Sequence, residues 1–532
     1  MDIIFEGVRV QASTRIILDD ISGVAQAGKL TSLMGSSGSG KTTLLTTLAR
    51  RFEPNLLYAG TIRYGGEKWQ VKHRREIAFV RQDDIVPEYL TVQEHLDFSS
   101  KLRLSVSDEA RRERVNRVIT QLKLEKCRNT LLGGHSQRGV SGGERKRACI
   151  ANELLTDPKV LFTDEPTSGL DSTLSAVVVE ILKDLALRDG LTVLTTIHSP
   201  SSSIFDKFDS LFILDEGRTF YRGSARELSK FLADLGRPVP DNFNPADFVM
   251  DILVLDKSHI TDEKVIKSME QFKQLELPND IAVSNVSAPH PKPSSFNNVT
   301  KKKSIFRSKP SELARSVMFK PGDDTDEEQH TRIYARSFFS QVTILTKRLW
   351  KKHSRDIFTI QQVCSTIGLA LISGLLFFQL GFAEASIFPR ISLTLWICGT
   401  DMYLATFSTV FALHDEIPLL KKELFDGSYS LVSHFLAKQL VLYPLNGFWS
   451  VIFCTLVLAS SRLAPSAANA VLVILVNQLQ IFLYQAVGFF ISAAVPPSGL
   501  VVASVVVVTY FFAFNGFFSP FPLMAPWYGW LR

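Results

Sequence analysis

Nine consecutive residues constrain the fold of this chain most, because they form a phosphate-binding loop. The pattern G-x-x-x-x-G-K-[ST] occurs without a gap in the run Gly35, Ser36, Ser37, Gly38, Ser39, Gly40, Lys41, Thr42 and Thr43. Residues 30–34 before the loop read as a buried strand, and residues 43–50 after it have the leucine spacing of a helix. A strand, a glycine loop and a helix are the context that this motif requires. The sequence therefore predicts a nucleoside triphosphate site, in which Lys41 reaches the phosphates and the Thr42 hydroxyl holds Mg²⁺.

Length and charge limit the remaining possibilities. A chain of 532 residues is expected to form two or more domains. The 59 basic and 53 acidic residues are too evenly balanced to indicate a nucleic-acid partner. The five cysteines have no paired spacing, so the sequence predicts neither a metal site nor a disulfide framework. No signal peptide is visible at residues 1–6, and we therefore expect the nucleotide domain to be cytosolic.

A second anion-binding loop is predicted at Ser141, Gly142 and Gly143, which open a helix. The N-terminus of a helix favours a negative ligand. One chain cannot easily place two such loops on one triphosphate, so we expect this loop to close over nucleotide held by another copy. A plain N-cap at Ser141 is the alternative for this stretch taken alone.

Three predicted strand ends supply the remaining polar groups of the site. The strand that begins at residue 160 ends in Asp164, placed to hold Mg²⁺ through water, and Glu165, placed to orient or deprotonate the hydrolytic water. The strand at residues 191–197 delivers His198, which is placed to contact the γ-phosphate. Gln82 follows the strand at residues 77–80 and would extend its amide to Mg²⁺ or to the attacking water, although glutamine after a strand is by itself a weak signal.

In order and spacing, these groups together with Ser168, Gly169, Leu170 and Asp171 resemble the full motif set of an ATP-binding cassette ATPase. The signature followed by Glu-Arg-Lys-Arg, and residues 196–201 and 244–248, resemble a narrower group, the white/brown-type half-transporters of the G subfamily. The resemblance implies an α/β P-loop nucleotide-binding domain followed by an all-α polytopic transmembrane domain. It also implies ATP hydrolysis coupled to transport, ATP and Mg²⁺ as cofactors, and a second half-transporter chain as partner in a homodimer or heterodimer.

Two positions depart from the pattern of that family. Ser199 stands where the group more often has glutamine. No tyrosine precedes the phosphate loop where many cassette ATPases stack adenine, and Phe5 is the nearest aromatic residue upstream. Triphosphate binding is therefore predicted more firmly than selectivity for the base.

The expected domains are the nucleotide-binding domain at residues 1–255, a flexible cytosolic linker at 256–336, an amphipathic connecting helix at 337–355 and a transmembrane domain at 356–532. The linker is rich in serine and proline and has separate basic and acidic runs. The connecting helix has apolar and basic residues at helical spacing, which is typical of a helix lying at the inner membrane surface.

Five apolar stretches are each long enough to span a membrane, which takes about 20 residues. They are residues 357–380, 391–413, 436–460, 467–495 and 500–518. Basic residues precede the first span, and Lys421 and Lys422 lie between the second and third spans. Because basic residues favour the cytosolic side, we expect both of these segments to be cytosolic. The loop at residues 414–430 is then cytosolic and polar, and resembles the loop that couples the two domains in this family. The family has a sixth span, so we expect a C-terminally truncated chain.

Asp401 is the residue that stands out inside the spans, because a charge at the bilayer centre costs about 2.5–3.5 kcal/mol. A substrate cavity is predicted from Asp401, Leu404, Ser408, Phe511 and Phe512. Bonding of Asp401 to a neighbouring helix is an equal alternative. The resulting hypothesis is ATP-driven export of a lipid, sterol or hydrophobic small molecule by a dimer of half-transporters in contact with membrane lipid. An ATP-controlled channel or regulatory membrane subunit is the alternative, and the membrane concerned is not identified by the sequence.

Overall fold

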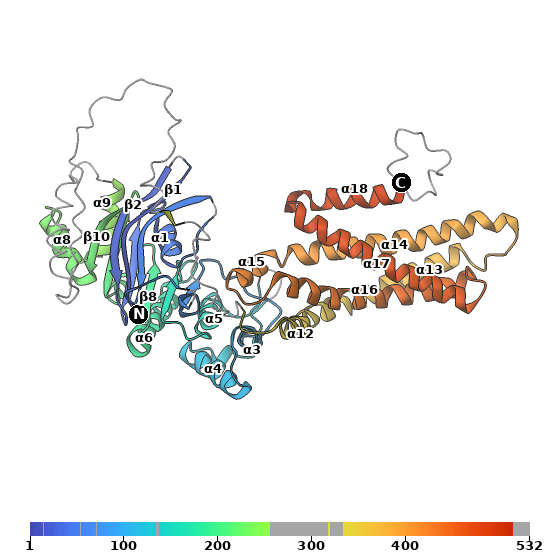
Figure 1. Cartoon of the computed structure of the whole chain (residues 1–532), viewed down its shortest axis with the longest axis horizontal. Coiled ribbons are helices and arrows are strands. Elements are labelled where there is room, and N and C mark those ends of the chain that lie inside the picture. The colour runs from blue at the N-terminus through green and yellow to red at the C-terminus, as the bar shows by residue number, and fades with distance from the viewer. Residues whose placement is uncertain are drawn as a thin grey trace, which may run out of the picture. The chain divides into compact units, whose positions relative to one another are not determined.

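The computed structural model describes residues 1–13, 15–53, 55–70, 72–134, 138–255, 318–319 and 334–513 (Figure 1). They form two compact units. Unit 1 comprises Met1–Asp84, Thr91–Leu96 and Arg112–Thr331, and unit 2 comprises Ile85–Leu90, Asp97–Arg111 and Arg332–Arg532. Most of the predicted linker lies outside the described residues, and the predicted domain limits remain predictions.

A six-stranded sheet forms the centre of unit 1, in the order β10-β9-β3-β8-β7-β6. The strands are β3 (Leu30–Gly35), β6 (Ile77–Val80), β7 (Val160–Thr163), β8 (Thr192–Thr196), β9 (Ser210–Asp215) and β10 (Arg218–Ser224). All neighbouring pairs are parallel except β9 with β10. Every residue of β3, β7 and β8 is buried, as expected for a parallel sheet covered on both faces. The carboxyl ends of β3, β6, β7 and β8 therefore meet at one edge.

A second, antiparallel sheet packs beside the first. It contains β1 (Ile3–Ala12), β2 (Arg15–Ala25), β4 (Leu56–Tyr64), β5 (Glu67–Lys68) and β11 (Met318–Phe319). One apolar core joins the two sheets, and in it the rings of Phe5 and Phe212 lie 5.6 Å apart. Phe5 is only 1% exposed, so its ring is not available to stack on a nucleotide base.

Helices cover the sheets of unit 1 (Figure 1). They are α1 (Lys41–Leu48), α2 (His73–Glu76), η1 (Glu125–Cys127), α5 (Gly142–Leu154), α6 (Ser172–Asp189), α7 (Ser202–Phe205), η2 (Ala225–Glu227), α8 (Leu228–Asp234) and α9 (Pro245–Leu255). Two more helices, α3 (Val92–Arg103) and α4 (Asp108–Gln121), contribute residues to both units. Helix α4 is rich in charged residues, but Val115, Val118 and Ile119 on one face are buried.

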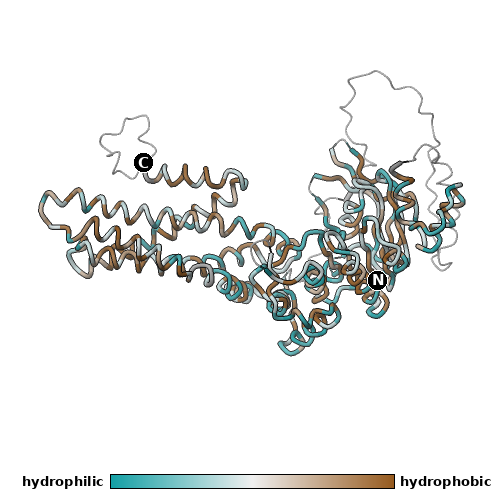
Figure 2. The backbone as a smooth tube through the Cα atoms, turned by 180° about the vertical axis from the view of Figure 1, so that it is seen from behind, coloured by the Kyte–Doolittle hydropathy of each residue, from teal (hydrophilic) through white to brown (hydrophobic). Residues whose placement is uncertain are grey.

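Unit 2 is helical. Its helices are α12 (Phe338–Ile357), α13 (Ile360–Leu376), η4 (Glu384–Ser386), α14 (Ile387–His414), α15 (Ile417–Phe425), α16 (Leu431–Ser461), α17 (Ala467–Ala494), η5 (Pro497–Gly499) and α18 (Leu500–Ala513). Among the described residues, α16 and α17 are long and apolar enough to cross a membrane, whereas α13 and Pro497–Phe511 are apolar but shorter. Figure 2 shows hydrophobic residues along the length of these helices. Each of the five predicted spans overlaps a helix, although residues 514–518 of the last one lie outside the described residues, and the number of spans across a membrane remains a prediction.

The segment between α14 and α16 is not the polar loop that the sequence suggests. It contains the helix α15, and its Tyr429 is fully buried. Val342, Leu345 and Leu349 of α12 pack with Tyr429, with α16 and with Leu102 of α3. The apolar face of α12 is therefore largely occupied by protein, although Phe339 and Trp350 are exposed.

Candidate functional site

The phosphate loop connects the end of β3 to the start of α1. Gly35 needs to be glycine, because a Cβ atom there would lie 2.2 Å from the carbonyl oxygen of Leu214, and its φ is +148°. Gly40 has a φ of 98° and caps α1. The ammonium of Lys41 donates to the carbonyl oxygens of Gly35 and Ser36, both at 2.9 Å. Burial lowers the pKa of Lys41, while Glu165 and Asp164 act in the opposite direction. The lysine is thus held inside the loop and faces the two carboxylates.

The two carboxylates follow β7 and are linked by a threonine from the neighbouring strand β8. The Thr196 hydroxyl donates to Asp164 Oδ1 at 2.6 Å and accepts from the backbone N–H of Glu165 at 2.7 Å. Asp164 Oδ1 also accepts from the Thr42 hydroxyl at 3.2 Å. Sequence reasoning missed Thr196, and the available signal was a hydroxyl residue at the end of the strand that delivers His198.

Gln82 lies against the same carboxylates. Its side-chain amide donates to Glu165 Oε2 at 2.9 Å. Its backbone oxygen accepts from Lys146 of α5 at 2.7 Å, and Lys146 also forms an ion pair with Asp84 at 2.7 Å. Lys146 is 1% exposed, and the sequence motif that contains it, Glu-Arg-Lys-Arg, gave it no individual role. It connects α5, which Ser141 caps, to the strand end that carries Gln82.

The other two predicted contributors are exposed. His198 follows β8, and its Nδ1 lies 3.2 Å from the Ser199 hydroxyl. Ser141 caps α5 by accepting from the backbone N–H of Glu144 at 3.3 Å, while the Glu144 carboxylate accepts from the backbone N–H of Ser141 at 2.9 Å. This reciprocal pair is a capping box, so the N-cap alternative is realised. Ser141 and Gly142 remain exposed, whereas Gly143 is buried against Leu174.

Comparisons with known proteins identify the family. Residues 18–168 match the ABC transporter family, and residues 198–355 and 340–532 match ABC-2 type transporter families. Identity is 32% to ABC transporter G family member 21 of Arabidopsis thaliana, over 90% of this chain and 69% of that protein. Identity is also 32% to the ABC transporter ATP-binding protein/permease wht-1 of Caenorhabditis elegans, over 97% of this chain and 75% of that protein. The chain belongs to the G family of ABC transporters.

A third relative is the Broad substrate specificity ATP-binding cassette transporter ABCG2 of Sus scrofa, 32% identical over 97% of this chain and 77% of that protein. The predicted fold class is confirmed, because an α/β nucleotide-binding domain precedes a helical membrane domain. This G-family ABC transporter is therefore an ATP-binding ATPase coupled to transport. Two segments within the ATPase match, Ile85–Leu90 and Asp97–Arg111, belong to unit 2.

The residues at the phosphate loop of the transporter also fit Mg²⁺. The Thr42 hydroxyl and an Asp164 oxygen lie 3.2 Å apart at the loop, and hydroxyl and carboxylate oxygens are ligands that Mg²⁺ prefers. Among the described residues, no three His, Cys, Asp or Glu side chains cluster in a way that could hold a metal by themselves. Substrate phosphates would have to complete the ligand set, as is usual for this ion.

A cavity of about 410 Å³ lies among α12, α13, α14 and α16 of unit 2. Asp401, Leu404 and Ser408 of α14 line it, as does Ile481 of α17. The Asp401 carboxylate accepts from the Ser450 hydroxyl at 2.7 Å and from the Asn477 amide. Asp401 is therefore bonded to neighbouring helices, and it also lines a cavity, whose role as a substrate site remains a prediction.

The aromatic residues proposed for this cavity lie elsewhere or are not described. The Phe511 ring packs edge-to-face on the Tyr484 ring, with 5.6 Å between the ring centroids. Phe511 is 36% exposed and is not among the described residues that line the cavity. The side chain of Phe512 lies outside the described residues.

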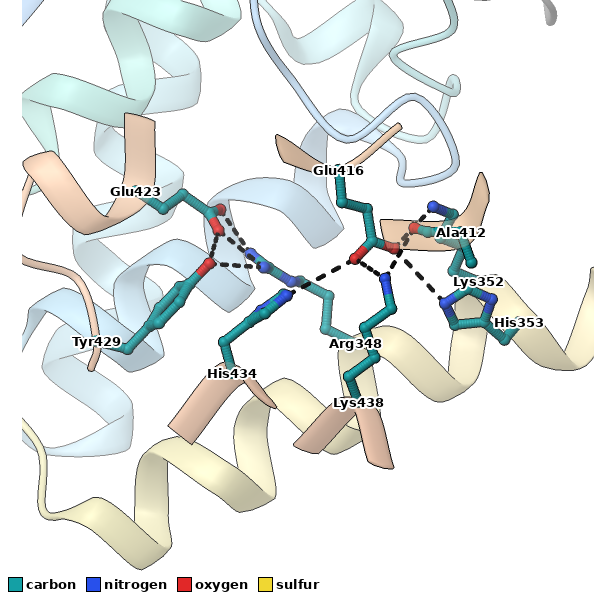
Figure 3. A network of polar contacts seen from close by, with 9 residues as sticks. All are labelled: Arg348, Lys352, His353, Ala412, Glu416, Glu423, Tyr429, His434 and Lys438. Atoms are coloured by element: carbon teal, nitrogen blue, oxygen red, sulfur yellow. Dashed lines mark hydrogen bonds and ion pairs between the residues drawn. The ribbon is translucent and has the colours of Figure 1, made fainter. Parts of the chain in front are cut away.

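A buried ionic network ties α12 to α15 and α16 (Figure 3). Arg348 donates two hydrogen bonds to the Glu423 carboxylate, at 2.6 and 2.8 Å. Glu416 accepts from Lys352 at 2.8 Å and from Lys438 at 2.6 Å, and His353 and His434 lie 3.5 and 3.7 Å away. Burial alone would raise the pKa of Glu416, but these basic groups hold it well below its usual range.

Lys422 of α15 donates to the backbone oxygen of Ile85 at 3.0 Å, which connects the network to the segment that follows Gln82 in the chain.

Proposed function

We propose that this G-family transporter is a half-transporter that exports a lipid, sterol or other hydrophobic small molecule as a dimer with a second half-transporter chain. The observation that carries the proposal is the hydrogen-bonded series from Thr42 through Asp164 and Thr196 to Glu165. These residues, to which we assign ATP hydrolysis, lie close together in a chain whose second half supplies apolar helices. Relatives named as transporters support the coupling to export.

In the proposed ATP site, the phosphate loop and Lys41 hold the phosphate chain. Thr42, Asp164 and, through its amide oxygen, Gln82 would hold Mg²⁺, which neutralises charge on the phosphates. Glu165 orients or deprotonates the attacking water, and His198 contacts the γ-phosphate. Catalysis of this kind is mainly positioning and electrostatic stabilisation, so the fixed geometry around Glu165 is its main requirement.

The site would be completed by the second chain. Ser141 and Gly142 are exposed at the positive end of α5, which suits them to face nucleotide bound on a partner. Closing of two such sites would move the segment after Gln82. In unit 2 this segment, Ile85–Leu90, contacts Lys422 of α15, so α15 and α12 are the proposed route from ATP to the membrane helices.

The proposed topology has the ATPase domain in the cytosol and five membrane spans. It rests on the basic residues of α12 and on Lys421 and Lys422, which the positive-inside rule places at the cytosolic face. Which membrane the protein occupies, and whether its partner is identical to it, are outside this proposal.

The proposal is tested with the full chain reconstituted in lipid vesicles. Glu165→Gln should retain ATP binding and lose at least about 99% of ATP hydrolysis, as expected for removal of a catalytic general base. Glu6→Gln, an exposed glutamate of β1, is the matched control and should keep full activity. Normal hydrolysis by Glu165→Gln would contradict the assignment. Permeation that ATP switches on but that proceeds only downhill would instead favour an ATP-controlled channel.

A further inference from the structure

Asp401 is a carboxylate among apolar helices that has no cationic partner in the described part of the chain. It is 5% exposed, and its hydrogen-bond donors, Ser450 and Asn477, are both neutral. Both donate to the same oxygen, Oδ2. An ionisable residue inside a membrane segment is costly, and it usually marks a ligand or ion path with a partner of opposite charge.

A residue that lines the cavity beside Asp401 has a polar atom without a hydrogen-bond partner among the described residues. The indole nitrogen of Trp449 is buried and has no hydrogen-bond partner among the described residues, and Trp449 lines the same cavity. The wall also includes the apolar side chains of Leu404, Leu442 and Phe453, which lie among neutral polar residues such as Ser408 and Asn446. A volume of about 410 Å³ is within the range of small-molecule sites.

Other charged groups reach this cavity at its end near α12, and they are Lys352, His353 and Asp415. Lys352 is already paired with Glu416 at 2.8 Å. Asp401 is thus the acidic group of this cavity that lies in the body of the helices, whereas Asp415 follows the end of α14.

From this arrangement we infer that the cavity binds an amphipathic cation, whose protonated amine donates to Asp401 and whose apolar body lies against Leu404, Leu442 and Phe453. The Trp449 N–H donates to an acceptor atom of the same ligand. A neutral sterol would leave the buried carboxylate without a cationic partner. The inference rests on the proposed export function and names its substrate class.

The test uses two fluorescent probes that differ mainly in charge. Dansylcadaverine carries a primary amine, and its N-acetyl derivative is neutral. Binding to the detergent-solubilised full chain is measured by fluorescence titration. The intact chain should bind the amine at least about tenfold more tightly than the neutral probe, as expected for a charge-assisted hydrogen bond.

Asp401→Asn should abolish this preference while binding the neutral probe as before, which also shows that the variant is folded. Asp415→Asn, at the other end of the cavity, should keep the preference. Equal binding of both probes by the intact chain, or loss of the preference in Asp415→Asn and not in Asp401→Asn, would overturn the inference. The export proposal fails in a distinguishable way. A charge preference in binding without ATP-driven transport would support the cation site and contradict the export function. ATP-driven transport without a charge preference would support the export function and contradict the cation site.

Discussion

Arg348 of α12 binds Glu423 of α15 through two parallel hydrogen bonds, at 2.6 and 2.8 Å. The Arg348 side chain is 4% exposed and that of Glu423 12%. Two-point pairing of this kind fixes orientation as well as distance, so it holds α12 and α15 in one arrangement.

Breaking this pair should destabilise unit 2. Arg348→Met leaves the Glu423 charge buried without its partner, and the expected cost is about 3–5 kcal/mol. The thermal unfolding midpoint of the protein in detergent micelles should fall accordingly. Lys347→Met, at the exposed neighbouring position, is the control and should unfold like the unaltered chain. An unchanged midpoint in Arg348→Met would show that the pair contributes little to stability.

Acid should destabilise unit 2 through the same network. Burial would raise the pKa values of Glu416 and Glu423, but their basic partners lower both below the ordinary value of 4.5. Since the folded state binds these protons less readily than the unfolded state, their contribution is present above about pH 4.5 and is lost as pH falls through the lowered values. The thermal unfolding midpoint should therefore decrease when the pH is lowered below about 4.5.

Glu416→Gln should start from a lower unfolding midpoint and show a shallower decline in acid, because one of the two groups no longer titrates. Glu384→Gln, an exposed glutamate of η4, should follow the curve of the unaltered chain. The measurement is the thermal midpoint at a series of pH values. Identical acid slopes in Glu416→Gln and the unaltered chain would count against this explanation.

Thr196 should act as a positioning residue for ATP hydrolysis. Thr196→Val keeps the shape of the side chain but removes the hydroxyl that joins Asp164 to the backbone of Glu165. We expect kcat to fall about 10- to 100-fold with little change in the KM for ATP, because a hydrogen bond to a charged group is lost where the geometry matters most.

Thr196→Ser should restore most of this activity, which a purely structural role in packing would not predict. Thr195→Val is the matched control, since adjacent strand residues face opposite sides of the sheet. Its hydroxyl makes only a 3.5 Å contact with the Thr196 oxygen. A Thr196→Val enzyme with normal kcat would exclude the positioning role.

Lys422 should transmit the nucleotide state to α15. ATP bound in the Glu165→Gln background is expected to change hydrogen exchange in Ile417–Phe425, measured by mass spectrometry. Lys422→Met removes the bond to the Ile85 oxygen and should reduce this ATP-dependent change to less than about a third. Lys421→Met, at the exposed adjacent position, should retain it. An equal response in both variants would place the coupling contact elsewhere.

The sequence alone determined the parts of this protein whose chemistry depends on short-range patterns. The phosphate loop needs glycines at fixed offsets from Lys41, and a parallel strand buried on both faces reads as an apolar run that ends in polar residues. For these reasons the α/β fold, the strand ends at Gln82, Asp164 and His198, and the helical membrane half were all predictable.

Tertiary structure decided which of these residues touch. Thr196 and Lys146 join the motifs only because β7 lies beside β8 and α5 lies beside β6, and no local spacing encodes these contacts. The polar segment between α14 and α16 forms the helix α15 and keeps Glu416 and Glu423 largely out of water, because Arg348, Lys352 and Lys438, which come from two other helices, neutralise these carboxylates. From sequence alone, a charged residue is expected to be exposed. Its burial is stable only when residues distant in the chain supply charges of opposite sign, which the sequence pattern does not reveal.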